Sequence, residues 1–291
     1  MTDDKAENLM IEGEKQITKF APFTSSDEKH EKARDKFLQA ATQFKAASNW
    51  SRAAQAYQRA SDMSTILKNE SDFVSDCESA AMALRKAGDK RANDLLMRVV
   101  DMYDKAGKYS QAAKFCVTLA DSAEFSATDT LEWLNKAIRY YRNDGSKVTA
   151  AELVQRTANV HLSANNYSDA RKIFEKLGRE ALDDRLSRGS ARKYFFAALL
   201  CELANLSGTN LDEGVSQLSE HFNQYQDEDN QFNEHTREHM LIRALISAIE
   251  AGDLNAYEEA VNDYDNIVPL DDKKSKMILR AKQLLRNQGL R

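Results

Sequence analysis

The sequence predicts an all-α protein, a right-handed superhelical array of tetratricopeptide-like antiparallel helix pairs that ends in a C-terminal helical bundle. Three observations lead to this prediction. The 291 residues are 42% hydrophobic and 30% charged and include only two prolines, a composition typical of helix-rich globular proteins. Apolar residues recur at helical spacing through most of the chain. A short signature also repeats with a period of about 39 residues, which accommodates two helices and two turns.

The repeated signature is a polar turn followed by a large residue and, three positions later, an alanine. Small alanines let paired helices approach closely, while the large residue fills the space beside the turn. Each copy therefore marks the beginning of a helix in a packed pair. The copies are Asn49–Ala53, Lys108–Ala112 and Asn166–Ala170, with a weaker one at Gly88–Ala92.

The helices of the array are expected in alternating order along the chain. The first helices of successive pairs begin near Ala33, Phe73, Ala112 and Ala151, and the second helices near Ala53, Ala92, Glu132 and Ala170. A single pair cannot cover its own apolar faces, so neighbouring pairs must stack. Five glycines fall where a helix is expected to stop, and we interpret them as left-handed C-terminal caps. They are Gly88, Gly107, Gly145, Gly178 and Gly252.

The strict period is lost after about Gly189. Helices are then expected near Ser190–Leu206, Glu234–Ala251, Ala256–Tyr264 and Lys273–Asn287, with a polar acidic loop around Gln226–Gln231. We therefore divide the chain into two parts. Residues 1–189 form an N-terminal helix with a hairpin-repeat array, and residues 190–291 form a C-terminal helical bundle.

Composition and motifs argue against several classes of function. The formal net charge of -5 leaves no general basic surface for nucleic acid, so no nucleic-acid partner is expected. The chain has no G-x-x-x-x-G-K-[ST], G-x-G-x-x-G, G-x-S-x-G or C-x-x-C motif, so we expect no enzyme and no cofactor. Its acidic N-terminus and the absence of an apolar run of about 18 residues predict a cytoplasmic protein. Cys77, Cys116 and Cys201 are expected to be reduced core residues.

One stretch has the spacing of a metal site. His235, Glu238 and His239 match H-x-x-E-H, which on a helix places two imidazoles one turn apart for zinc, with the glutamate as general base. The stretch is very polar and offers no third ligand. We therefore expect a solvated first helical turn and no metal, and keep a zinc hydrolase as an alternative of a different class.

Two aromatic residues flank a proline near the N-terminus. Pro22 should end the first helix and leave Phe20 and Phe23 on a loop. Two interpretations remain open for the pair. They pack against the first helix pair, or they dip into a bilayer interface and give weak, reversible attachment.

Several stretches together resemble the soluble NSF attachment protein family, and in particular its alpha/beta branch. The resemblance runs from the first helix to the last residue, and a generic helical repeat would not share these stretches. The strongest are Ala46–Ser51, Ala112–Lys114, Ser190–Phe196, Ala198–Cys201, Asp263–Asp265, Leu270–Asp271, Met277–Arg280 and the final Leu290–Arg291.

The resemblance implies an adaptor that binds assembled SNARE complexes and recruits and stimulates the hexameric ATPase NSF for SNARE disassembly. The implied partners are bundles of syntaxin, SNAP-25-like and synaptobrevin-type helices, the NSF hexamer and, weakly, the cytosolic face of membranes. The free protein is expected to be a monomer. The alternative is a generic tetratricopeptide-like scaffold that binds peptide tails of other proteins.

The SNARE-facing positions of the family are basic, and the resemblance places Lys108, Lys114, Arg156 and Arg192 there. Three of these four are expected at or just after a helix start. A further family lysine is matched by Glu152, which reverses the charge.

The resemblance also assigns residues to the other contacts of the adaptor. The family's C-terminal leucine, which stimulates NSF, corresponds to Leu290, and NSF-facing acidic residues correspond to Glu250 and Asp253. The membrane loop of the family corresponds to Phe20 and Phe23, and it is shorter and less apolar here than in the family.

Overall fold

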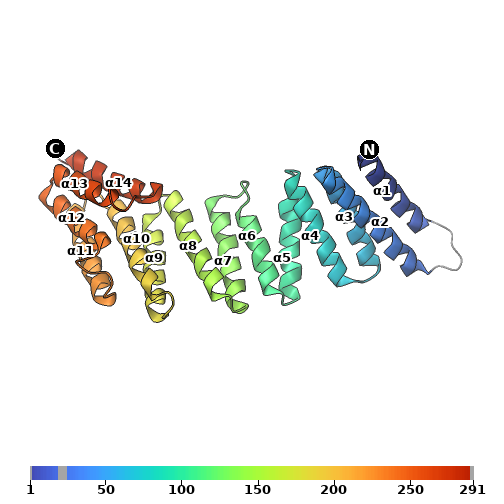
Figure 1. Ribbon diagram of the computed structural model, residues 1–291, viewed down its shortest axis with the longest axis horizontal. Helices are drawn as coiled ribbons and strands as arrows, with labels where there is room; N and C mark the ends of the chain where they lie inside the picture. The colour runs from blue at the N-terminus through green and yellow to red at the C-terminus, as the bar shows by residue number, and fades with distance from the viewer. Residues whose placement is uncertain (1, 19–24, 289–291) are drawn as a thin grey trace. The chain divides into compact units, whose positions relative to one another are not determined.

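A computed structural model describes residues 2–18 and 25–288 of the chain. Within these residues every regular element is helical, with fourteen α-helices and one short 3-10 helix (Figure 1). The chain divides into two compact units, Met1–Lys147 and Val148–Arg291. The predicted all-helical architecture of antiparallel hairpins is confirmed within each unit. The proposed boundary between residues 189 and 190 stays a prediction.

Unit 1, Met1–Lys147, is a series of helices that pack each against the next. Consecutive helices run antiparallel (Figure 1). Its helices are α1 (Thr2–Thr18), α2 (Ser26–Ala46), α3 (Trp50–Ile66), α4 (Glu70–Lys86), α5 (Arg91–Lys105), α6 (Tyr109–Ala120) and α7 (Ala127–Asn143).

One turn geometry recurs between the helices of unit 1. A residue with positive φ follows each of the helices α2 to α5, at Ser48 (58°), Lys68 (56°), Gly88 (71°) and Gly107 (67°), about 20 residues apart along the chain. The residue that follows is the N-cap of the next helix at three of these turns, namely Asn49, Asn69 and Lys108, and the two asparagine side chains accept backbone N–H bonds. The period of about 39 residues therefore consists of two nearly equal halves with the same kind of turn.

Alanines let the helices of unit 1 approach closely. Ala40, Ala53 and Ala80 are fully buried in one core cluster that spans α1 to α5. A polar interaction also joins α2 to α4. Arg34 donates hydrogen bonds to both carboxylate oxygens of the buried Asp76 at 2.8 and 3.0 Å.

Unit 2, Val148–Arg291, is built around α10. This helix contacts α9, α11, α12 and α14, and its buried residues, which include Phe195, Leu199 and Leu203, lie on all sides of it. The elements are α8 (Lys147–Ser163), which begins on the last residue of unit 1, α9 (Tyr167–Asp183), η1 (Arg188–Ser190), α10 (Ala191–Ala204), α11 (Leu211–Glu228), α12 (Arg237–Ala251), α13 (Leu254–Asp265) and α14 (Asp272–Gln288).

Two expectations about unit 2 are wrong. Gly178 is not a C-terminal cap, because it lies inside α9, where a Cβ would meet Phe195 Cε1 at 2.6 Å. The glycine is needed there for close packing of α9 on α10. The segment between Leu206 and Glu234 also contains a helix that we did not predict, α11, which occupies the first half of the expected Gln226–Gln231 loop.

Other expectations are confirmed. Gly88, Gly107, Gly145 and Gly252 have positive φ at helix ends, and the four helices expected in the C-terminal part are present as α10, α12, α13 and α14. All three cysteines are buried and unpaired. Within residues 2–18 and 25–288, none of the helices has the length and apolar content that crossing a bilayer requires.

Candidate functional site

Two of the basic candidates lie on α6 of unit 1. Lys108 is the N-cap residue of this helix and Lys114 lies in its second turn, and both side chains are exposed. Their Nζ atoms lie 6.0 Å from the Tyr103 ring centroid and 5.5 Å from the Phe115 ring centroid, respectively. A lysine stem that lies against an aromatic ring leaves its ammonium group in solvent. The helix therefore presents two accessible positive charges.

Lys108 also lies at the edge of a groove between α4 and α5. The groove has a volume of about 790 Å³, and Phe73, Val74 and Met102 are among its apolar lining residues. Tyr103 completes the apolar wall and donates a hydrogen bond to Glu78 Oε2 at 2.7 Å. Burial raises the pKa of this tyrosine, so its hydroxyl stays a donor at neutral pH.

The other two basic candidates lie in unit 2 and are less exposed. Arg156 is half-buried in the middle of α8, and Arg192 is half-buried in the first turn of α10. The Nε atom of Arg192 lies 3.7 Å from Oε1 of Glu238 in α12, too far for a hydrogen bond but close enough for an ion pair. Nε is itself buried and has no hydrogen-bond partner among the described residues. The positive charge of Arg192 is therefore partly compensated inside the protein.

The four basic positions are divided equally between the two units. Only Lys108 and Arg192 lie at or just after a helix start, so the expectation of three such positions is wrong. Because α6 begins at Tyr109, before the expected Ala112, Lys114 lies in the second turn of that helix.

Glu152 is exposed on α8, four residues before Arg156. Residues at this spacing share one helix face, so the charge reversal places a carboxylate beside a basic position. The same carboxylate acts together with burial, which is the larger effect, to raise the pKa of Tyr194 in α10.

The acidic candidates flank the tight turn between α12 and α13. Glu250 is exposed in the last turn of α12, and Gly252 has φ of 67° in the turn. Asp253 is also exposed, and its Oδ1 accepts hydrogen bonds from the backbone N–H groups of Asn255 and Ala256 at 2.9 and 3.0 Å. This carboxylate therefore has a structural role as the N-cap of α13 as well as its charge. The other two sets of candidates, Leu290 and the pair Phe20 and Phe23, lie outside the described residues.

The H-x-x-E-H stretch is not a solvated turn throughout, which corrects our expectation. His235 is exposed, but His239 is buried at 3% exposure, and its Nε2 lies 3.0 Å from Gln226 Oε1. Phe222 lies against the buried ring, with centroids 4.6 Å apart. Glu238 pairs with Arg192 instead of facing the histidines, and no group of three metal-ligating side chains occurs in the described part of the chain.

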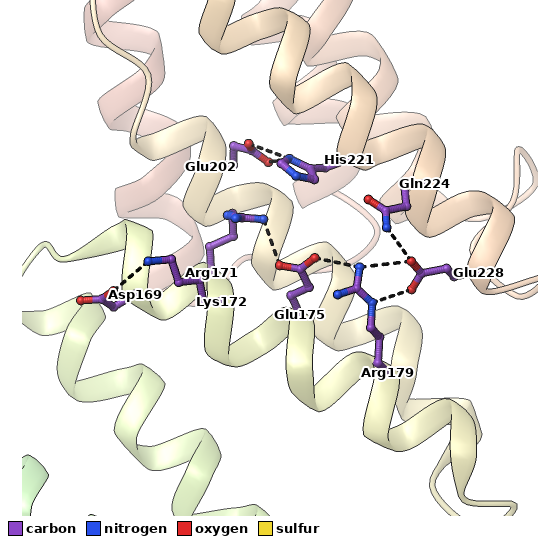
Figure 2. Close-up of polar contacts among 9 residues, drawn as sticks. All are labelled: Asp169, Arg171, Lys172, Glu175, Arg179, Glu202, His221, Gln224 and Glu228. Atoms are coloured by element: carbon purple, nitrogen blue, oxygen red, sulfur yellow. Dashed lines mark hydrogen bonds and ion pairs between the residues drawn. The ribbon is translucent and has the colours of Figure 1, made fainter.

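A polar network holds α11 against α9 and α10 in unit 2 (Figure 2). Arg179 of α9 contacts Glu175 at 2.8 Å and Glu228 of α11 at 3.0 Å. Glu202 of α10 lies 2.9 Å from Nδ1 of His221 in α11, and burial raises the pKa of Glu202. The network stabilises the position of α10, which carries Arg192. Sequence reasoning missed it because α11 was not predicted.

The described residues form two units of stacked antiparallel helices, and this architecture defines an all-α helical-repeat protein. Residues 4–286 match the family described as "Soluble NSF attachment protein, SNAP". The chain belongs to this family.

Individual relatives are similar over nearly their whole length. The chain is 29% identical to the alpha-soluble NSF attachment protein of Mus musculus, over 95% of this chain and 93% of that protein. It is 28% identical to the beta-soluble NSF attachment protein of Bos taurus, over 98% and 95%. It is 27% identical to the probable vesicular-fusion protein sec17 homolog of Schizosaccharomyces pombe, over 90% and 89%.

Proposed function

We propose that this protein is an adaptor that binds assembled SNARE complexes and recruits and stimulates the NSF ATPase, so that SNARE complexes are disassembled in vesicle trafficking and membrane fusion. The observation that carries this proposal is the family match over residues 4–286, which includes helices of both units. Relatives of similar length are named as NSF attachment and vesicular-fusion proteins. Members of this family are adaptors, and we assign no catalytic step to this chain.

The SNARE-facing surface consists of Lys108, Lys114, Arg156 and Arg192. Lysine ammonium groups that are free in solvent can meet acidic rows on the outside of a helical bundle, and such complementary charges set the register of association. The resulting attraction is screened by salt, so binding should weaken steeply as ionic strength rises. Bundles of syntaxin, SNAP-25-like and synaptobrevin-type helices are the proposed partners of the monomeric protein.

Charge reversal on α6 tests this surface. Lys108→Glu together with Lys114→Glu should reduce binding to an assembled SNARE complex by roughly tenfold or more. Both side chains are exposed, so the melting temperature should not change. Lys86→Glu together with Lys90→Glu is the matched control, because these lysines of unit 1 are also exposed. Equal affinity of the α6 variant and the wild type would show that Lys108 and Lys114 do not contact the SNARE complex.

The proposed NSF-contacting residues are Leu290, Glu250 and Asp253. Leu290→Ala should leave SNARE binding intact and remove NSF-driven disassembly. Glu250→Gln together with Asp253→Asn should also slow disassembly, and asparagine retains the capping ability of Asp253, so α13 remains intact. Disassembly at the wild-type rate in both variants would show that NSF uses another surface.

Membrane contact is proposed to be weak and peripheral, on the cytosolic side, through Phe20 and Phe23. A pair of phenylalanines supplies only a few kcal/mol of interfacial binding. Phe20→Ser together with Phe23→Ser should therefore reduce co-sedimentation with liposomes without altering SNARE binding in solution. Unchanged co-sedimentation would favour packing of these rings against the first helix pair.

The alternative function, a scaffold that binds peptide tails, is not favoured by the family assignment. The two functions differ in what they require of the partner. A peptide-tail scaffold binds short isolated peptides, whereas the adaptor requires the folded SNARE bundle. Titration with single SNARE-motif peptides and with the assembled complex therefore separates them.

A further inference from the structure

A groove of about 510 Å³ lies within unit 2, lined by residues of α8, α9, α10, α12, α13 and α14. Its apolar surface includes Phe196 and Met277, each 3% exposed, and Val268, which is 38% exposed. Gln155 and Asn159 of α8 also line it, and Arg156 lies between them in sequence. The groove is therefore next to the proposed SNARE-facing residues of this unit, and it combines an apolar surface with polar sides.

The acidic side chains that line the groove have charged partners within the protein, whereas two of its lysines have none among the described residues. Glu238 and Asp271 are the two carboxylates that line the groove, and each already interacts with a basic side chain of the protein. Glu238 pairs with Arg192 at 3.7 Å, and Asp271 Oδ2 accepts a hydrogen bond from Lys274 Nζ at 2.5 Å.

Two further lysines line the groove, Lys193 of α10 and Lys273 of α14. Both are exposed, and neither ammonium group has an ion-pair partner in the part of the chain that the structure describes. The protein as a whole has a formal net charge of -5, so two uncompensated cations beside one apolar surface form a local exception to an acidic background. Such a site favours a ligand that carries carboxylates next to an apolar side chain.

We propose that this groove receives an acidic stretch of the outer surface of the SNARE bundle, with Lys193 and Lys273 meeting its carboxylates and Val268 contacting an apolar side chain between them. The inference rests on the proposed function and deepens it, because it adds two residues and an apolar contact to the SNARE-facing surface. Since both ammonium groups are solvated before binding, their contribution should depend strongly on salt.

The test is the affinity of Lys193→Glu together with Lys273→Glu for an assembled SNARE complex at about 0.15 M salt. This variant should bind at least roughly tenfold more weakly than the wild type, with an unchanged melting temperature. Lys172→Glu together with Lys176→Glu is the matched control, because both lysines are exposed on α9 of the same unit, do not line the groove, and contact only exposed carboxylates. The control should change affinity by less than about twofold.

A charge exchange identifies the chemistry of the partner. A SNARE complex whose outward acidic residues along one row are replaced by lysine should lose affinity for the wild-type protein and regain it for the Lys193→Glu, Lys273→Glu variant. If affinity is not regained, the proposal that the groove binds acidic side chains of the SNARE bundle is wrong. An equal loss in the α9 control would overturn it as well, since the effect would then be one of net charge alone.

The outcomes also separate this inference from the proposed function. If the wild-type protein does not bind the assembled complex, both fail. If the wild type binds, and reversal of Lys108 and Lys114 weakens binding while reversal of Lys193 and Lys273 does not, the adaptor function stands and the groove assignment alone is wrong.

Discussion

Gly178 of α9 lies directly against the ring of Phe195 in α10, and a Cβ at this glycine would be 2.6 Å from Phe195 Cε1. The same relationship occurs in unit 1, where a Cβ on Gly13 of α1 would lie 2.6 Å from Phe37 Cε1 in α2. Both rings are fully buried. In each unit, then, one pair of helices packs tightly at a position where a glycine faces a phenylalanine.

Gly178→Ala should destabilise the protein by up to about 2 kcal/mol. Alanine gains about 1 kcal/mol in helix propensity, but the new methyl group must displace a ring that also stacks on Tyr225, at a centroid distance of 4.5 Å. Overpacking of this kind costs about 1–3 kcal/mol and therefore outweighs the gain. Urea unfolding measures the difference.

Gly189→Ala is the control for this substitution. The nearest atom to a methyl group at this position would be Gln231 Oε1 at 4.0 Å, so the stability of the variant should lie within about 0.5 kcal/mol of the wild type. A more stable Gly178→Ala protein would mean that Phe195 moves freely.

Asp76→Ala should be far more damaging than Asp72→Ala, although both carboxylates contact Arg34. Asp76 is 2% exposed and also accepts a hydrogen bond from Ser64 Oγ at 2.7 Å. Its removal leaves a largely buried guanidinium without its bidentate partner, which costs about 3 kcal/mol. The Asp72 side chain is 39% exposed, so its loss should cost less than about 1 kcal/mol. Similar losses in the two variants would contradict this assignment.

The fold was predictable where it depends on short-range patterns. Alanines and aromatic residues, such as Ala53 and Trp50, predict helices because apolar residues recur every three or four positions, about once per helical turn. The missed helix α11 carries the same kind of pattern, with Val215, Leu218 and Phe222 all buried. A stricter count of apolar spacing would have found it in spite of its polar surroundings.

The candidate site was predictable only in part, because side-chain partners come from distant segments. The basic identity of Arg192 is visible in the sequence, but its pairing with Glu238 depends on the packing of α10 near α12. The burial of His239 likewise depends on Gln226 and Phe222 of α11. Sequence spacing alone placed both His239 and Glu238 in a solvated turn.

The buried His239 of the H-x-x-E-H stretch should couple stability to pH. Burial lowers the pKa of His239 below its usual value, so the folded protein binds fewer protons there than the unfolded chain. Stability from this group is therefore present above about pH 6.5 and is lost as pH falls through the folded-state pKa. His239→Leu should flatten this part of the pH profile in urea unfolding.

His235→Leu is the matched control for the pH profile. The His235 side chain is 85% exposed, so the substitution should preserve the loss of stability below about pH 6.5. The assignment fails if the wild type and both variants have the same slope.

Removal of divalent metal should leave the protein unchanged. Nε2 of His239 contacts Gln226, Glu238 contacts Arg192, and Nε2 of His235 lies 3.8 Å from Oε1 of Glu234, so each residue of the stretch already has a protein partner. Treatment with a strong chelator should therefore not shift the melting temperature. Stoichiometric zinc in the purified protein, together with destabilisation by the chelator, would revive the zinc-hydrolase alternative.

Glu238→Gln should increase the affinity for an acidic partner about threefold to tenfold at low salt. In the free protein the Glu238 carboxylate lies 3.7 Å from Arg192 Nε and also lines the groove of unit 2. It therefore competes with any partner carboxylate for the same guanidinium, and glutamine removes the charge while retaining the size of the side chain.

Glu234→Gln is the control, because its side chain is 69% exposed and its ion-pair contact is with His235. Binding of the assembled SNARE complex should tighten only in the Glu238 variant, and the difference should shrink as salt rises because the competition is electrostatic. Weaker binding would instead show that Glu238 orients Arg192 for its partner.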